Sequence, residues 1–149
     1  MKNGPVEPFG RAPGYPVFLA LVGGGAGYTA AVPAAVKIAQ AFVGAAGVFL
    51  IGVAAYRMGG ARPAMAAAAI AAVYPPLVWV SAYAYSEALF WTIGLGLAIV
   101  MSRTFEEPRA SAWKWGLVSG AVVAIAILVR AATLLYVPLV AVWLLWKRQ

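Results

Sequence analysis

Residues 115–146 read WGLVSGAVVAIAILVRAATLLYVPLVAVWLLW, an apolar run of 32 positions with one charged residue, Arg130. A helix that crosses a bilayer needs about 20 apolar residues, so this run is long for one span. An arginine at mid-membrane costs about 2.5–3.5 kcal/mol on insertion scales. We therefore expect two short helices that meet at a turn near Arg130. One long tilted helix with a buried arginine is the less favoured alternative.

The composition of the whole chain agrees with this interpretation. Of 149 residues, 64% are hydrophobic and 10% are charged, and the mean hydropathy is +0.89. Soluble domains carry roughly a quarter charged residues, so this composition excludes a soluble globular or disordered protein. We expect an all-α polytopic membrane helical bundle with about five transmembrane helices and an N-terminal interfacial or re-entrant helix.

Three residue types that carry chemistry are missing from the sequence. It contains no Cys, no His and no Asp, so disulfides and thiolate or imidazole metal ligands are excluded. We expect no metal site and no cofactor. The carboxylate side chains are Glu7, Glu87, Glu106 and Glu107.

Apolar runs alternate with prolines, glycines and polar residues along the chain, and this alternation defines the expected helices and loops. We expect residues 1–16, with four prolines, to form an extracytoplasmic loop, and the glycine-rich residues 17–32 to form the interfacial or re-entrant helix. Further spans are expected at 34–56, closed by a Gly59-Gly60 turn, at 63–82 and at 86–102, followed by a polar connector over 104–114 and the two short helices. In domain terms, 17–146 is the transmembrane domain and 147–149 a cytoplasmic tail.

The basic residues predict the orientation. The loops assigned to the inner face hold seven of them, and the outer side holds Lys2, Arg11, Lys37 and Arg130. The seven inner residues are Arg57, Arg62, Arg103, Arg109, Lys114, Lys147 and Arg148. The positive-inside rule then places the N-terminal loop outside. Because the basic residues punctuate apolar runs and form no solvated patch, we expect no nucleic-acid partner.

Aromatic residues follow the same division. The outer corner is bracketed by Trp79, Tyr83, Tyr85 and Trp91, and the inner boundary by Trp113, Trp115, Trp143 and Trp146. The predicted topology brings Arg11, the 75–87 corner and Arg130 to the outer face.

Each of these candidates has a structural and a functional interpretation. Glu87 can cap a helix, since the helix dipole favours a carboxylate there, or it can face a polar cavity. Arg130 can reach the headgroups or pair with Glu87, or it can bind a phosphate with its planar fork of donors. Arg11, beside a Pro-Gly turn, is a weak signal by itself.

The remaining motifs receive structural interpretations. Glu106 and Glu107 lie among arginines and are expected to be solvated. The glycines at 23–27 lack the preceding strand and the Lys of a phosphate loop. Gly44 and Gly47 are expected to permit close helix packing.

Three segments in order resemble membrane glycosyltransferases of the GT-C fold. Residues 11–20, RAPGYPVFLA, are similar to the family segment RPPGYPLFLA. Residues 74–79, YPPLVW, with 86–90, SEALF, resemble the family's next outer corner, and residues 116–139 resemble its pair of short helices. The closest group contains the dolichyl-phosphate-mannose protein mannosyltransferases and the aminoarabinose transferases, and the resemblance covers about residues 9–146.

This resemblance implies transfer of a hexosyl or pentosyl group from a polyprenyl-phosphate-linked donor, with inversion, to a lipid, glycan or protein acceptor at the outer face of the plasma membrane. It implies that Arg11, Glu87 and Arg130 bind substrate, with the arginines at the donor phosphate. The family's general base is an Asp in the first outer loop, upstream of the arginine motif. Because this sequence has no Asp, we assign no catalytic residue and expect a truncated transferase, inactive alone. The alternatives are a small transporter or channel subunit that uses Glu87 and Arg130, and a scaffold without enzymatic activity.

Overall fold

A computed structural model describes residues 12–23, 32–83, 85–106 and 109–138, together with Val142 and Trp146. Among these residues all regular secondary structure is helical, with no strand. The helices are α1 (Gly14–Leu21), α2 (Ala34–Gly59), α3 (Ala61–Val73), α4 (Pro75–Ala82), α5 (Ser86–Glu106), α6 (Arg109–Val129) and the 3-10 helix η1 (Ala131–Leu135). The expected all-α class is therefore confirmed for the described part of the chain.

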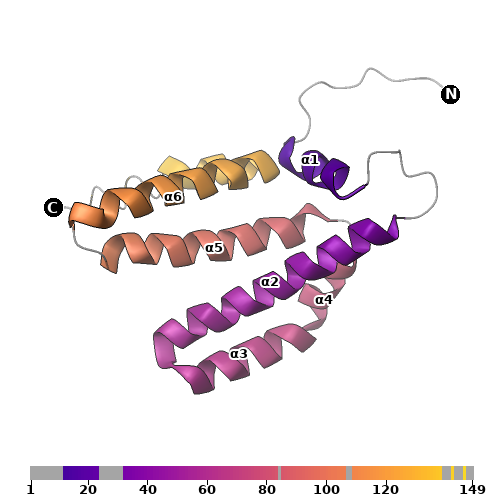
Figure 1. The fold of residues 1–149 in the computed structure, drawn as a ribbon, viewed down its shortest axis with the longest axis horizontal. Coiled ribbons are helices and arrows are strands. Elements are labelled where there is room, and N and C mark those ends of the chain that lie inside the picture. Colours follow the sequence, from indigo (N-terminus) through magenta and orange to yellow (C-terminus); the bar gives the residue numbers. More distant parts are fainter. Residues whose placement is uncertain are drawn as a thin grey trace.

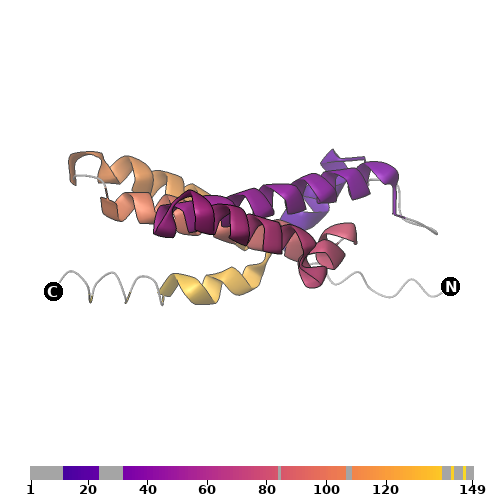
Figure 2. The same cartoon turned by 90° about the horizontal axis from the view of Figure 1, so that it is seen from below.

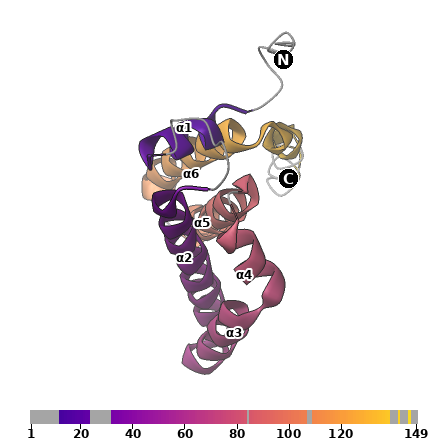
Figure 3. The same ribbon diagram turned by 90° about the vertical axis from the view of Figure 1, so that its right-hand side faces the viewer.

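The long helices lie side by side in a flat arrangement. Helix α5 packs between α2 and α6, and α3 packs along the other side of α2 (Figure 1). In the view turned by 90°, helices α2, α3, α5 and α6 form a thin layer (Figure 2). The segment after α6 reverses direction and runs beside this layer. In the end view, α1 lies against α6 (Figure 3). Helix α4 packs against both α2 and α3.

Glycines set the closest helix contacts. An added Cβ at Gly47 would lie 1.9 Å from Cη2 of Trp91 on α5, and one at Gly44 would lie 2.3 Å from Oγ of Ser81 on α4. Both positions on α2 are buried. Contacts this short leave no room for a methyl group. The prediction that Gly44 and Gly47 permit close packing is confirmed.

Two turns follow from local sequence. Gly60, between α2 and α3, has φ +81°, a conformation that glycine adopts without steric cost, and this confirms the expected turn there. The expected span over 63–82 is instead broken at Tyr74, where α3 and α4 meet with a bend of 56°. Tyr74 is extended, with φ −69° and ψ 114°, because Pro75 disfavours the helical region for the residue before it.

Two expected loops are shorter in the structure. The loop expected to reach residue 16 is wrong at its end, since α1 begins at Gly14. Pro16 lies in the first turn of α1, where its missing N–H has no acceptor within the helix. The connector expected over 104–114 is also wrong: α5 continues to Glu106, and α6 begins at Arg109. Arginine, glutamate, alanine and lysine are good helix formers, so these polar residues extend the helices.

Fewer of the described helices qualify as membrane spans, by length and composition, than the sequence predicts. Among the described residues, α2 alone is long and apolar enough to cross a membrane, and the bent pair α3–α4 passes the same test when counted as one span. Among the described residues of α6, Trp113–Val129 forms a shorter apolar helix.

Replacing Gly47 by Ala tests the α2–α5 contact. Its Cβ would overlap the Trp91 ring, so we expect the free energy of unfolding to fall by about 1–3 kcal/mol. Thermal unfolding in detergent measures the change. Gly94→Ala on α5 is the matched control, because no described atom lies within 4 Å of its Cβ position. An equal effect of both substitutions would contradict the assigned contact.

Candidate functional site

The first turn of α5 meets the break that follows α6. Arg130 lies between α6 and η1 in an extended conformation, with φ −148° and ψ 110°. Its Nη1 lies 3.5 Å from Oε1 of Glu87, and the two side chains are 43% and 47% exposed. The expected break near Arg130 is confirmed, and two of the three predicted site residues come together.

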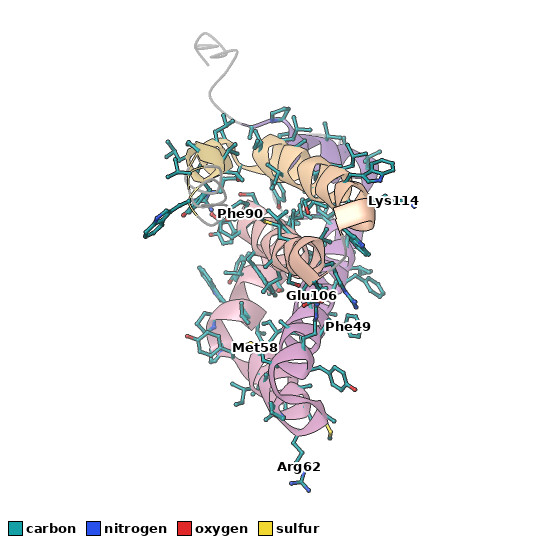
Figure 4. The ribbon with its side chains drawn as sticks, turned by 90° about the vertical axis from the view of Figure 1, so that its left-hand side faces the viewer. Phe49, Met58, Arg62, Phe90, Glu106 and Lys114 are labelled. Atoms are coloured by element: carbon teal, nitrogen blue, oxygen red, sulfur yellow. The ribbon has the colours of Figure 1, made fainter. Side chains whose placement is uncertain are left out.

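An aromatic ring completes the surroundings of the guanidinium. The Arg130 guanidinium carbon lies 5.4 Å from the centre of the Phe90 ring, and Figure 4 marks Phe90 on α5. Glu87 and Phe90 are three residues apart, so one face of α5 presents both a carboxylate and a ring. The site thus holds a half-exposed cation between a carboxylate and a π face.

Glu87 retains the capping environment that the sequence predicts. It lies in the first turn of α5, where the helix dipole favours a negative charge. Its Oε2 accepts a 3.5 Å hydrogen bond from Oγ of Ser86. The contacts with Ser86 and with Arg130 use different oxygens of Glu87, so the carboxylate makes both at once.

Hydrogen bonds hold the Arg130 backbone on both sides. Its N–H donates to the carbonyl of Ala126 at 2.9 Å, and its carbonyl accepts from the N–H of Thr133 at 3.0 Å. Thr133 is 7% exposed, and its Oγ1 donates to the Ala126 carbonyl at 3.3 Å. Thr133 therefore closes the turn from which the Arg130 side chain projects.

Helix α1 lies directly against the end of α6. An added Cβ at Gly14 would lie 2.7 Å from the backbone carbonyl carbon and oxygen of Leu128. Gly14 thus brings α1 within two residues of Arg130 along α6. Arg11, the third predicted site residue, lies outside the described residues.

Gln40, on α2, connects this helix to α1 and to the residue that precedes α5. Its side chain is completely buried. Its Nε2 donates to the Tyr15 hydroxyl at 2.8 Å and to the Tyr85 carbonyl at 3.0 Å. Oε1 of Gln40 is buried without a hydrogen-bond partner among the described residues. One amide on α2 therefore ties α1 to the residue that precedes α5.

The sequence prediction missed Gln40 and Thr133. The available signal was a single amide within the apolar stretch 34–56, since a buried polar side chain requires hydrogen-bond partners. Which partners it has depends on helices distant in sequence.

A second ion pair lies at the opposite end of α5. Arg57, on the last turn of α2, pairs with Glu106, which Figure 4 marks at the end of α5. It also donates to the Ile99 carbonyl at 3.2 Å and to the Ser102 hydroxyl. Glu106 is exposed, as the sequence predicts, and it also pairs with an arginine on another helix. Its carboxylate is half exposed but paired across helices, while Glu107 lies outside the described residues.

Part of the expected aromatic belt forms one cluster. The Trp79 ring lies 5.0 Å from that of Tyr83 and 5.8 Å from that of Tyr85. Trp91 does not join it, because its ring packs against Gly47 and its Nε1 is buried. The described residues contain no group of three or more acidic, His or Cys residues able to hold a metal ion.

A family model for the dolichyl-phosphate-mannose-protein mannosyltransferases matches residues 13–149. The chain belongs to this family. Neither the curated proteins nor the solved structures gives a match. The resemblance proposed from the sequence is confirmed, and the match includes α1, Glu87 and Arg130.

Membership in the mannosyltransferase family gives the general function. The family consists of membrane-integral glycosyltransferases that use polyprenyl-phosphate-linked sugar donors. The apolar helix α2 is consistent with a membrane-integral chain.

A double-mutant cycle tests the role of Gln40. We compare Gln40→Leu, Tyr15→Phe and the double variant by thermal unfolding in detergent. Because the two side chains share a 2.8 Å hydrogen bond, we expect a coupling energy of about 0.5–1.5 kcal/mol. Phe42→Leu, at an exposed position on α2, serves as the control. Additive effects of the two substitutions would contradict the contact.

Proposed function

We propose that the chain forms part of a membrane glycosyltransferase in which Arg130, Glu87 and Arg11 bind a polyprenyl-phosphate-linked sugar at the outer face. The observation that carries this proposal is the half-exposed guanidinium of Arg130, held beside Glu87 and Phe90 at a helix break. An arginine required only for packing would not need to project from such a break.

The chemistry of the leaving group explains the choice of arginine. When the sugar departs, negative charge develops on the polyprenyl phosphate. A guanidinium is always protonated and offers five N–H donors in a planar fork. The contact with Glu87 involves only Nη1, at 3.5 Å. No other described residue accepts from the remaining donors, which leaves them for phosphate oxygens, whose developing charge they stabilise.

Glu87 orients this cation and receives the sugar. Its carboxylate limits the positions of the Arg130 side chain, and its acceptor oxygens suit sugar hydroxyl groups. Arg11 precedes Gly14 by three residues, about 10 Å of extended backbone at most. Since Gly14 packs against Leu128, a second guanidinium within reach of the same phosphate fits this geometry.

No residue of the chain is assigned as the general base. The family resemblance assigns that role to an aspartate, and the sequence contains none. We therefore expect this chain alone to bind the donor without transferring the sugar. The proposal names the transferred group only as a hexosyl or pentosyl group. It names the acceptor only as a lipid, glycan or protein.

We also propose a five-span topology, formed by α2, the bent pair α3–α4, α5, α6 and the apolar stretch after Arg130. In this topology the N-terminal loop and the Glu87–Arg130 pair lie at the outer face of the plasma membrane, and the Arg57–Glu106 pair lies at the cytoplasmic face. The excess of basic residues in the loops assigned to the cytoplasmic face supports this orientation. Residues 17–32 then lie at the outer interface.

Single-cysteine labelling tests the orientation, because the chain has no cysteine of its own. Tyr83→Cys lies in the aromatic cluster, and Met58→Cys lies near the end of α2, where Met58 is 90% exposed. In intact cells we expect a membrane-impermeant maleimide to label the first variant, and to label the second only after permeabilisation. The reverse pattern would invert the topology.

Charge removal at Arg130 tests the phosphate site. We expect Arg130→Gln to weaken the binding of a polyprenyl phosphate to the purified chain about tenfold or more, because charge-assisted hydrogen bonds are lost. Native mass spectrometry in detergent measures this binding. Arg57→Gln breaks the other ion pair of α5 and is expected to leave the affinity unchanged. Equal losses in both variants would exclude a specific phosphate contact at Arg130.

A further inference from the structure

A trough lies between α2, α3 and α4. Its volume is about 610 Å³, within the range of sites that enclose small molecules. Six of its lining residues are Ala41, Gly44, Val48, Ala72, Leu77 and Val78. None of the lining residues belongs to α5, α6 or η1.

The trough results from small side chains and a bend. Alanines and glycines on α2 and α3 leave a shallow channel where larger residues would interdigitate. The 56° bend at Tyr74 turns α4 out of line with α3, and residues of α4 line the trough together with those of α2 and α3. Gly44 allows α4 to approach α2 at Ser81. An apolar chain fits such a lining.

One cation lines this apolar trough. Lys37 belongs to the lining and is exposed. It lies one turn into α2, at the end where Gln40 bonds to the corner before α5. The two ion pairs formed among the described residues involve other basic groups, Arg57 and Arg130. Within the part of the chain that the structure describes, Lys37 has no acidic partner.

These features suit an occupant with an apolar chain and a negative head. A lysine at one end of an apolar trough extends its ammonium to the headgroup level of a bilayer and attracts a phosphate. We propose that the trough between α2, α3 and α4 binds a membrane phospholipid with an anionic headgroup, its acyl chain against the small residues and its phosphate at Lys37. This site is distinct from the proposed donor site.

The separation of the two sites supports an ordinary bilayer lipid. In the end view, α3 and α4 lie on one side of α5, and α1, α6 and the following segment lie on the other (Figure 3). Glu87 and Arg130 belong to α5 and to the break after α6, and neither of these contributes a lining residue to the trough. A lipid in the trough contacts both α2 and the bent pair, so its binding stabilises their packing.

Thermal unfolding of the purified chain in a neutral detergent tests the proposal, with phosphatidylglycerol and phosphatidylcholine of identical acyl chains as probes. We expect phosphatidylglycerol to raise the Tm saturably and phosphatidylcholine to raise it less. Lys37→Gln is expected to weaken phosphatidylglycerol binding about fivefold, as for one lysine worth about 1 kcal/mol at a lipid surface. Lys114→Gln, which removes an exposed lysine on α6, is the control and should have no effect.

A second variant keeps the test independent of charge. Ala45→Phe fills the trough from an exposed lining position, and we expect it to abolish the Tm shift by either lipid. Inorganic phosphate alone should give no shift, which separates a lipid from a free anion. Equal shifts with both lipids, or an unchanged affinity in Lys37→Gln, would overturn the proposal. A dimer that Ala45→Phe dissociates would also overturn it, since a second copy would then fill the trough.

Arg130→Gln separates this inference from the proposed donor site. That variant should retain the full phosphatidylglycerol shift while losing affinity for polyprenyl phosphate. If Lys37→Gln lowered polyprenyl-phosphate affinity as strongly as Arg130→Gln does, the two sites would be one and the inference would fail.

Discussion

A guanidinium inside a long apolar run must reach polar partners, and the structure around Arg130 follows from this requirement. Helix α6 ends one residue before it, and η1 begins one residue after it. The extended residue between them directs the side chain to Glu87 and Phe90. An unbroken helix would leave this charge in hydrocarbon at a cost of several kcal/mol. The candidate phosphate site is therefore built at the point where the last apolar run breaks.

Helix α5 connects this site to the rest of the molecule. At its first turn Glu87 pairs with Arg130, and at its last turn Glu106 pairs with Arg57. Between them, Trp91 packs on Gly47 of α2. An ion pair as exposed as Glu87–Arg130 contributes little stability, so the close contact of Trp91 with Gly47 contributes more to the position of α5.

Sequence patterns predicted a large part of this arrangement. The break at Arg130 followed from run length and charge cost, and the packing role of Gly44 and Gly47 followed from small residues in an apolar helix. The partnership of Glu87 with Arg130 was weighed as one of several interpretations. The start of α1 and the length of α5 were missed, because helix propensity and proline position extend helices into polar segments. The role of Gln40 was missed because its partners, Tyr15 and Tyr85, lie 25 and 45 residues away.

The sequence by itself determined the all-α class, the positions of most helices and the family, since these depend on composition, apolar run length and motifs read along the chain. The tertiary structure alone decided which charges meet, which amide joins α1 to the residue before α5, and where a trough stays open beside Lys37. Those features depend on how helices distant in sequence approach one another. That approach is set by the sizes of facing side chains, such as Gly47 against Trp91 and Gly14 against Leu128, which no pattern within one helix specifies.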